Sequence, residues 1–235
     1  EYRRWAEASA AVRRYRSVTI GESLPFIAMS YSADNARLLP PFFPTHRSLD
    51  GLWGETVSAV DQRGFSAALP HCVVHQSGAN SVQTGSAPRY ADTVAEHLRM
   101  LLKGWSEYTP ALLGPPAARL ESMGEYFFAL GAGEWRALED RFRRAWQADA
   151  ESRIVALETA LEQFGHRPRQ WASDVELYLS SLVAFGERSA LQPPSDLGTE
   201  PAIAHETWRA LLRSYGSLLL HWEGMREAAG SLAGE

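Results

Sequence analysis

Amphipathic helical patterns fill the chain from residue 89 to residue 235 and constrain its fold more than any other feature. Apolar residues recur there every three or four positions, the spacing that returns side chains to one face of an α-helix. The pattern predicts helices over residues 90–108, 133–165 (one long helix or two collinear ones), 169–187 and 202–225. We therefore expect an all-helical domain at 89–235, arranged as a bundle or as a wrap around the rest of the chain. The clearest faces are Val94, Leu98, Leu101 and Trp105; Trp135, Leu138, Phe142, Trp146, Ile154, Leu157, Leu161 and Phe164; and Trp208, Leu211, Leu212, Tyr215, Leu219 and Trp222.

Residues 1–88 show a mixed pattern and are expected to form a separate α/β segment. Short runs rich in β-branched and aromatic residues predict strands, and turn-forming residues bound them. Helices are expected at 1–15 and 48–64, and strands at 17–20, 25–32 and 66–76. The fold class that follows is α+β, predominantly α.

Composition excludes several classes of protein. The net charge of -5 argues against a nucleic-acid-binding protein, which usually carries a basic field. The single cysteine, Cys72, cannot form an intrachain disulfide and suits a reducing compartment, so we expect a cytoplasmic protein. Apolar runs stay shorter than the roughly 18–20 residues that span a bilayer, so no transmembrane segment is expected.

A proline-rich stretch, "LLPPFFPTHRSLDGLWGE" at 38–55, leads into the predicted helix at 48–64. Each proline fixes its own φ and biases its predecessor towards extended backbone. Asp50 then falls in the first helical turn, where the helix dipole favours a charged carboxylate. Such a carboxylate can act as a general base, and Arg47 can pair with a phosphate or carboxylate. The alternative is a capped helix start with Arg47 in solvent.

Two further groups of polar residues are candidates for a site. His71 and His75 lie four apart in the strand predicted at 66–76, so both side chains point to one face and could share a transition metal. Asp34 and Asn35 follow the strand predicted at 25–32, a place where loops often hold substrates. The alternatives are surface histidines and an ordinary turn stabilised by Asp and Asn.

The stretch "DNARLLPPFFPTHRSLDGLWGETVSA" resembles a segment of bacterial family-2-like glycosyltransferases of the GT-A fold. In that family an "LDNR…LPPF.P..R.EDG.FG" pattern leads from the sheet into a helix. The resemblance covers residues 19–75, roughly a quarter of the chain. The matching residues are Asp34, Asn35, Arg37, Leu39, Pro40, Pro41, Phe42, Pro44, Arg47, Asp50, Gly51 and Gly54, with Trp53 in an aromatic position.

The resemblance implies transfer of a sugar from a nucleotide-sugar donor, with Asp50 as the general base on the acceptor side. It gives substrate-binding roles to Arg47, Asn35 and Asp34. Leu49 replaces the glutamate that precedes the base in the family.

The resemblance also implies a divalent metal, Mn or Mg, near the donor diphosphate, with His71 or His75 as a ligand. The family's donor-binding half and its Asp-x-Asp motif do not occur in these residues, so we expect them in an upstream part of the same protein or in a partner chain. The alternative function is a non-catalytic helical interaction or scaffold protein.

Overall fold

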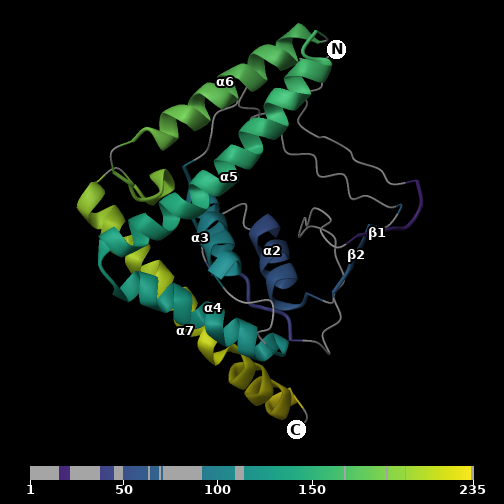
Figure 1. Cartoon of the computed structure of the whole chain (residues 1–235). Coiled ribbons are helices and arrows are strands. Elements are labelled where there is room, and N and C mark those ends of the chain that lie inside the picture. Colours follow the sequence, from purple (N-terminus) through teal and green to yellow (C-terminus); the bar gives the residue numbers. More distant parts are fainter. Residues whose placement is uncertain are drawn as a thin grey trace, which may run out of the picture. The chain divides into compact units, whose positions relative to one another are not determined.

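A computed structural model describes residues 16–21, 38–44, 50–62, 64–68, 70, 92–108, 114–166, 168–188, 190–198 and 200–233 (Figure 1). Two three-residue strands, β1 (Thr19–Gly21) and β2 (Ser66–Ala68), pair as a small sheet. The rest is mainly helical: α2 (Asp50–Val60), α3 (Val94–Tyr108), α4 (Pro116–Ala132), α5 (Trp135–Phe164), α6 (Arg169–Gly186), the 3-10 turn η1 (Ser195–Leu197) and α7 (Pro201–Ala233). The predicted fold class, α+β with helix predominant, is confirmed.

The helices follow the sequence pattern closely where that pattern is periodic. The stretch 133–165 forms one continuous helix, α5, and the apolar face predicted for α3 is fully buried at Val94, Leu98 and Leu101. The stripe on α5 is buried only in its first half, since Leu138 and Phe142 are enclosed while Phe164 is 58% exposed. The helix expected at 1–15, the strand expected at 25–32 and nearly all of 69–76 lie outside the described residues.

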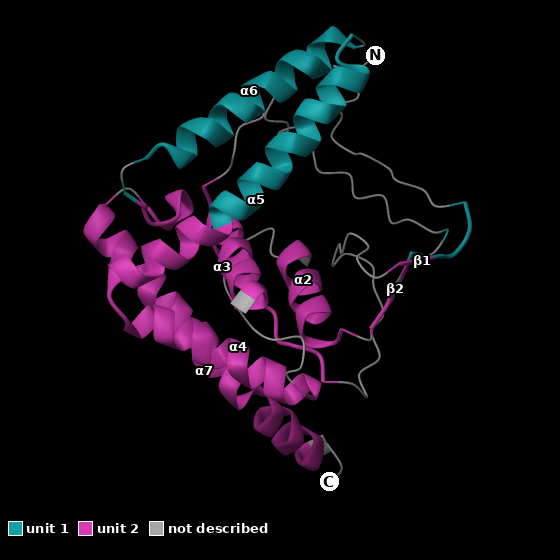
Figure 2. Cartoon of the chain, in the orientation of Figure 1, with its two compact units in different colours: residues 1–19, 68–91, 146–190 teal, residues 20–67, 92–145, 191–235 magenta. Residues whose placement is uncertain are grey.

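The chain divides into two compact units that are not contiguous in sequence (Figure 2). Unit 1 comprises residues 1–19, 68–91 and 146–190, and unit 2 comprises residues 20–67, 92–145 and 191–235. Helix α5 contributes its first part to unit 2 and the remainder to unit 1. The sequence boundary expected at residue 88 falls in the undescribed stretch 71–91, so it stays a prediction.

Unit 2 is built on an antiparallel pair of helices, α4 and α7, that lie side by side (Figure 1). Glycines let the two backbones approach closely: a Cβ on Gly124 would lie 2.8 Å from the Leu220 amide nitrogen, and one on Gly131 would lie 2.6 Å from the Arg209 carbonyl oxygen. Arg213 donates to the Gly131 carbonyl at 3.0 Å, which places a positive charge at the C-terminal end of α4, where the helix dipole favours it.

The N-terminal end of α3 is fixed in unit 2 by the turn η1. The Val94 amide donates to the Asp196 carboxylate at 2.9 Å, so a side chain from a distant segment satisfies one of the free N–H groups of the first turn. Ser195 donates to the Asp92 carbonyl from both its amide and its hydroxyl. These bonds hold α3 against the segment that leads into α7.

In unit 1 the second part of α5 packs against α6. Trp146 lies close to Gly186, where any larger residue would meet the indole, and its ring centroid is 5.4 Å from that of Phe185. Arg153 donates to the Tyr178 hydroxyl at 3.1 Å. Within the described ranges of the whole chain, no helix is long and apolar enough to cross a membrane.

Candidate functional site

The candidate base, Asp50, is the first residue of α2. The proline-rich segment at 38–44, here called the ramp, is neither helix nor strand and ends six residues before it. The predicted placement of Asp50 in the first turn of a helix is therefore confirmed. The other predicted site residues, Arg47, Asn35, Asp34, His71 and His75, lie outside the described residues, so their proximity to Asp50 stays a prediction.

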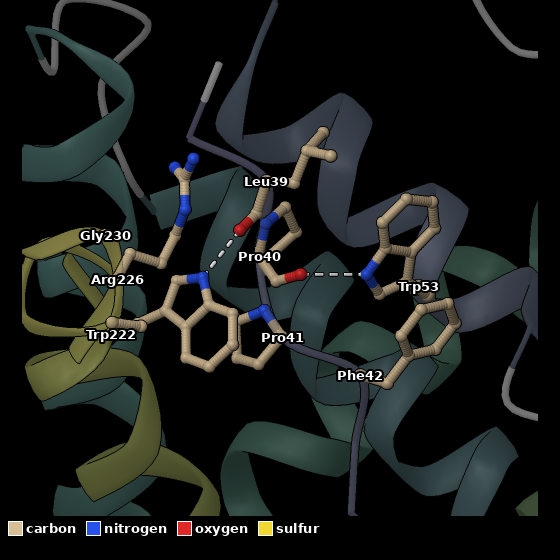
Figure 3. A pocket seen from close by; sticks show the side chains of 9 residues that line it. Leu39, Pro40, Pro41, Phe42, Trp53, Trp222, Arg226 and Gly230 are labelled. Atoms are coloured by element: carbon tan, nitrogen blue, oxygen red, sulfur yellow. Dashed lines mark hydrogen bonds between the residues drawn. The ribbon is translucent and has the colours of Figure 1, made fainter. Parts of the chain in front are cut away.

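Two tryptophans from different helices fix the ramp in place (Figure 3). The Trp53 indole N–H on α2 donates to the Pro40 carbonyl at 2.9 Å, and the Trp222 indole N–H on α7 donates to the Leu39 carbonyl at 2.6 Å. Backbone outside helices and strands has no regular ladder of hydrogen bonds, so its carbonyls need such outside donors when they are enclosed. The Phe42 ring also stacks on Trp53, with centroids 4.7 Å apart. The contact between Phe42 in the ramp and Trp53 in α2 therefore holds the ramp against the first turn of α2.

A charged cluster adjoins the first turns of α2. Arg99 on α3 donates to Glu55 on α2 at 2.8 Å and to Glu96 on its own helix. A Cβ on Gly51 would lie 3.4 Å from the Arg99 guanidinium, so this cation sits beside the residue that follows Asp50.

The guanidinium of Arg99 stays charged in this cluster. Partial burial by itself lowers the pKa of Arg99, but the charges and hydrogen bonds of Glu55 and Glu96 outweigh that effect, so its pKa rises above the ordinary value. A fixed cation can orient a nearby carboxylate or hold an anionic group of a substrate. Sequence reasoning did not identify Arg99, because nothing in its local pattern separates it from an ordinary helix-surface arginine.

A pocket of about 570 Å³ opens beside the ramp (Figure 3). The ramp contributes Leu39, Pro40, Pro41 and Phe42, and α2 contributes Trp53. The far wall is one face of α7, formed by Trp222, Arg226, Ala229 and Gly230. The spacing of these four residues returns them to the same side of the helix. The sequence pattern predicted Trp222 on the apolar face of this helix, but it did not predict that this face contacts the ramp.

A buried histidine lies elsewhere in unit 2. His97 on α3 is fully enclosed, with its Nε2 2.6 Å from the Asp92 carboxylate and its ring against Phe142 at 4.5 Å between centroids. A histidine–carboxylate pair can move protons, but a substrate has no route to a ring that is enclosed on all sides. We therefore assign the pair a structural role.

The described residues contain no group of three or more His, Cys, Asp or Glu side chains that could hold a metal ion. Glu55 on α2 and Glu96 on α3 are both bound by Arg99. The expected histidine ligands lie in the undescribed stretch 71–91, so a Mn or Mg site there stays a prediction.

Comparisons with known proteins identify no relative. No family model matches the chain, and no curated protein or solved structure matches it either.

Proposed function

We propose that the chain is the acceptor-side portion of a glycosyltransferase, in which Asp50 is the general base. The observation that supports this most strongly is the position of Asp50 at the first residue of α2, six residues after a ramp that Trp53 and Trp222 hold. A catalytic base must be held within a fraction of an ångström of its working position, and rigid supporting contacts provide that.

The reaction proposed is a single displacement. The Asp50 carboxylate accepts the proton of an acceptor hydroxyl while that oxygen forms a bond to the anomeric carbon of the donor sugar. The bond from that carbon to the diphosphate breaks, and the nucleoside diphosphate leaves with the bonding electrons. A carboxylate at a helix N-terminus is stabilised in its charged form, so it is ionised and able to accept a proton near neutral pH.

The donor nucleotide sugar requires a binding part, and none is identified among the residues that the structure describes. We propose that it comes from an upstream part of the same protein or from a partner chain, and that the reaction takes place in the cytoplasm. A divalent metal, Mn or Mg, at the donor diphosphate is part of the proposal, with His71 or His75 as a ligand, and no step assigned to Asp50 depends on it.

The scaffold alternative gains no specific support from the described helices of unit 1. It expects an exposed apolar patch of several hundred Å² on the helices. The exposed apolar residues of α5, Val155 and Phe164, lie roughly 180° apart around the helix at 100° per residue. Those of α6, Leu177 and Val183, lie roughly 120° apart by the same measure.

The test is replacement of Asp50 by Asn in the complete gene product. The assay measures release of nucleoside diphosphate from UDP-, GDP- and dTDP-sugars in the presence of membrane and polysaccharide fractions. Loss of a positioned general base lowers the rate by about 10² to 10⁴-fold. The matched control is Asp61→Asn, which makes the same change just beyond the other end of α2 and should keep the rate within about twofold.

Circular dichroism and thermal unfolding verify that both variants fold. Release from none of the donors by the wild-type protein would reject the proposed function. Equal rates for Asp50→Asn and the wild type would remove Asp50 as the base.

A further inference from the structure

We propose that the N-terminal end of α4 binds a phosphate group, either the free ion or the phosphate of a small phosphorylated molecule, with Arg119 as its counter-ion. This proposal rests on α4 alone and does not depend on the transfer reaction proposed for Asp50.

Arg119 is a buried cation. It is only 6% exposed and lies on the buried face of α4, at helical spacing from Met123 and Phe127. A long arginine side chain often buries its stem and keeps its guanidinium in water. Here even the Nε of the guanidinium is enclosed, and it has no hydrogen-bond acceptor. The charged group of Arg119 is therefore largely removed from water.

Other arginines that the structure describes are paired although they are less buried. Arg99, Arg143 and Arg153 are each more exposed than Arg119, and each binds a carboxylate. Arg119 forms no ion pair with any carboxylate in the described ranges. A buried charge without a partner is costly, because it loses its hydration and gains nothing in exchange. An anion from solution supplies the missing partner.

The first turn of α4 offers further donors to an anion. Its cap residue, Pro115, makes no side-chain hydrogen bond to the helix, and no acidic residue lies in the first turn. The Arg119 amide donates to the Pro115 carbonyl at 3.3 Å, whereas the amides of Ala117 and Ala118 have no acceptor among the described residues. These two N–H groups lie at the positive end of the helix dipole, where phosphate groups commonly bind.

The guanidinium and the two free amides serve the same end of the helix. Helical side chains tilt towards the N-terminus and cover the preceding turn. Arg119 lies one turn after Pro115, a rise of about 5.4 Å, which an arginine side chain spans. An arginine fork and two main-chain N–H groups match the three terminal oxygens of a phosphate monoester, which also carries up to two charges. A carboxylate has only two oxygens and one charge, so phosphate is the better fit.

The space in front of α4 is open to a ligand. Gly114 and Pro115 are exposed, and a Cβ added at Gly114 would meet no atom within 4 Å. A phosphate can therefore reach the first turn from solvent, and the remainder of a phosphorylated molecule can extend away from the protein.

The experiment titrates the protein with inorganic phosphate by isothermal titration calorimetry, in a phosphate-free buffer at pH 7.5. We expect saturable one-to-one binding with a Kd at or below about 1 mM. A second arm uses dimethyl phosphate, which has one charge and two terminal oxygens. Its Kd should be at least about tenfold higher, because it loses both charge and acceptors.

A third arm, with methyl phosphate, distinguishes the two sources of the group. A Kd equal to or below that of inorganic phosphate assigns the site to a phosphorylated molecule. Binding of inorganic phosphate alone assigns it to the free ion.

Two variants locate the binding on α4. Arg119→Gln should weaken phosphate binding by at least about tenfold, while Arg144→Gln, at an exposed position on α5, should leave it unchanged. Ala117→Asp places a carboxylate of the protein itself at the free amides and should weaken binding by about tenfold. Ala129→Asp makes the same change at an exposed position farther along α4 and should keep the wild-type Kd.

Thermal unfolding separates this role of Arg119 from a purely structural one. In phosphate-free buffer, Arg119→Gln should unfold at or above the wild-type temperature, because the substitution removes an unpaired buried charge. Added phosphate should raise the unfolding temperature of the wild type more than that of the variant, because only the wild type binds the ion strongly.

Three results would each overturn the proposal. The first is absence of saturable phosphate binding to the wild-type protein. The second is an Arg119→Gln variant that binds phosphate as tightly as the wild type. The third is an equal Kd for the Ala117→Asp and Ala129→Asp variants. If one of the two locating variants does not fold, as judged by circular dichroism, the other decides the outcome.

Discussion

Tyr215 on α7 links the ramp to the core of unit 2. Its ring contacts Phe43 at 4.9 Å and Phe127 at 5.3 Å between centroids, and only 2% of its surface is exposed. Burial raises the pKa of its hydroxyl to about 12, against a smaller opposing effect of the hydrogen bond with Thr56. The folded protein therefore holds this proton more tightly than the unfolded chain, in which the pKa is about 10.

This difference predicts a loss of stability at alkaline pH. A raised pKa in the folded state stabilises the protein fully below pH 10, and that contribution falls as the pH rises towards 12. The total loss is at most about 3 kcal/mol, at 1.4 kcal/mol per pH unit. Urea unfolding at pH 9 and pH 11 measures about half of this loss, because pH 11 lies midway between the two pKa values. Tyr215→Phe should flatten the slope. An unchanged slope in Tyr215→Phe would contradict the assignment.

At the level of residues, the sequence predicted that Asp50 lies at the start of a helix, but not which side chains contact the ramp and α2. The proline run and the polar residues after it mark where a helix begins, because local backbone preference decides that point. The partner of Trp222 is a carbonyl 183 residues away, and the Arg99–Glu55 pair spans 44 residues. Local pattern carries no information about such pairs, since they depend on how the elements assemble.

At the level of elements, periodicity identified most helices but passed over α4 as an individual helix. Its signals were present: Pro116 at the first helical position, then buried Leu120, Met123 and Phe127 at helical spacing. The expected end of α7 near residue 225 was too early, because the helix continues to Ala233 through a stretch in which Ala, a strong helix former, recurs. Of the strand expected at 66–76, the structure describes a strand only at Ser66–Ala68, which is β2.

The α4–α7 pair predicts opposite effects for two glycine substitutions in one helix. A Cβ at Gly216 would collide with the Phe128 amide nitrogen and lie 2.7 Å from the Gly124 carbonyl oxygen, so Gly216→Ala should cost about 1–3 kcal/mol. A Cβ at Gly224 meets nothing within 4 Å, so Gly224→Ala should stabilise α7 by up to about 1 kcal/mol. Chemical denaturation of both variants measures the difference. Equal effects would show that the two helices lie farther apart.

At the scale of the whole molecule, the helical content can be predicted from the sequence, but the way in which the helices pack together cannot. An apolar stripe shows which side of a helix is buried, but not which other helix covers it. The glycines at 124, 131 and 216 would be taken for weak points in their helices, because glycine disfavours helix by about 1 kcal/mol. Their packing role emerges only when α4 lies against α7. The division into two non-contiguous units also depends on packing, because each unit brings together segments that are far apart in the sequence.

The two units should also differ in how readily they open. In unit 2, side chains such as Met123, Trp208 and Leu212 are fully buried in α4 and α7. In unit 1, Val155 and Phe164 on α5 and Leu177 on α6 are between 47% and 63% exposed. Local opening of a segment that buries less apolar surface costs less free energy, so its amides exchange faster.

We therefore expect amides in residues 155–164 and 170–184 to exchange with deuterium faster than those in 120–130 and 208–220, on the order of 100-fold. Mass spectrometry of peptic peptides measures this difference. Gly216→Ala provides the internal control: it should accelerate exchange in α4 and α7, which it forces apart, while exchange in α6 stays at the wild-type rate. Equal protection of all four segments in the wild-type protein would mean that unit 1 is as well packed as unit 2, and would contradict the prediction.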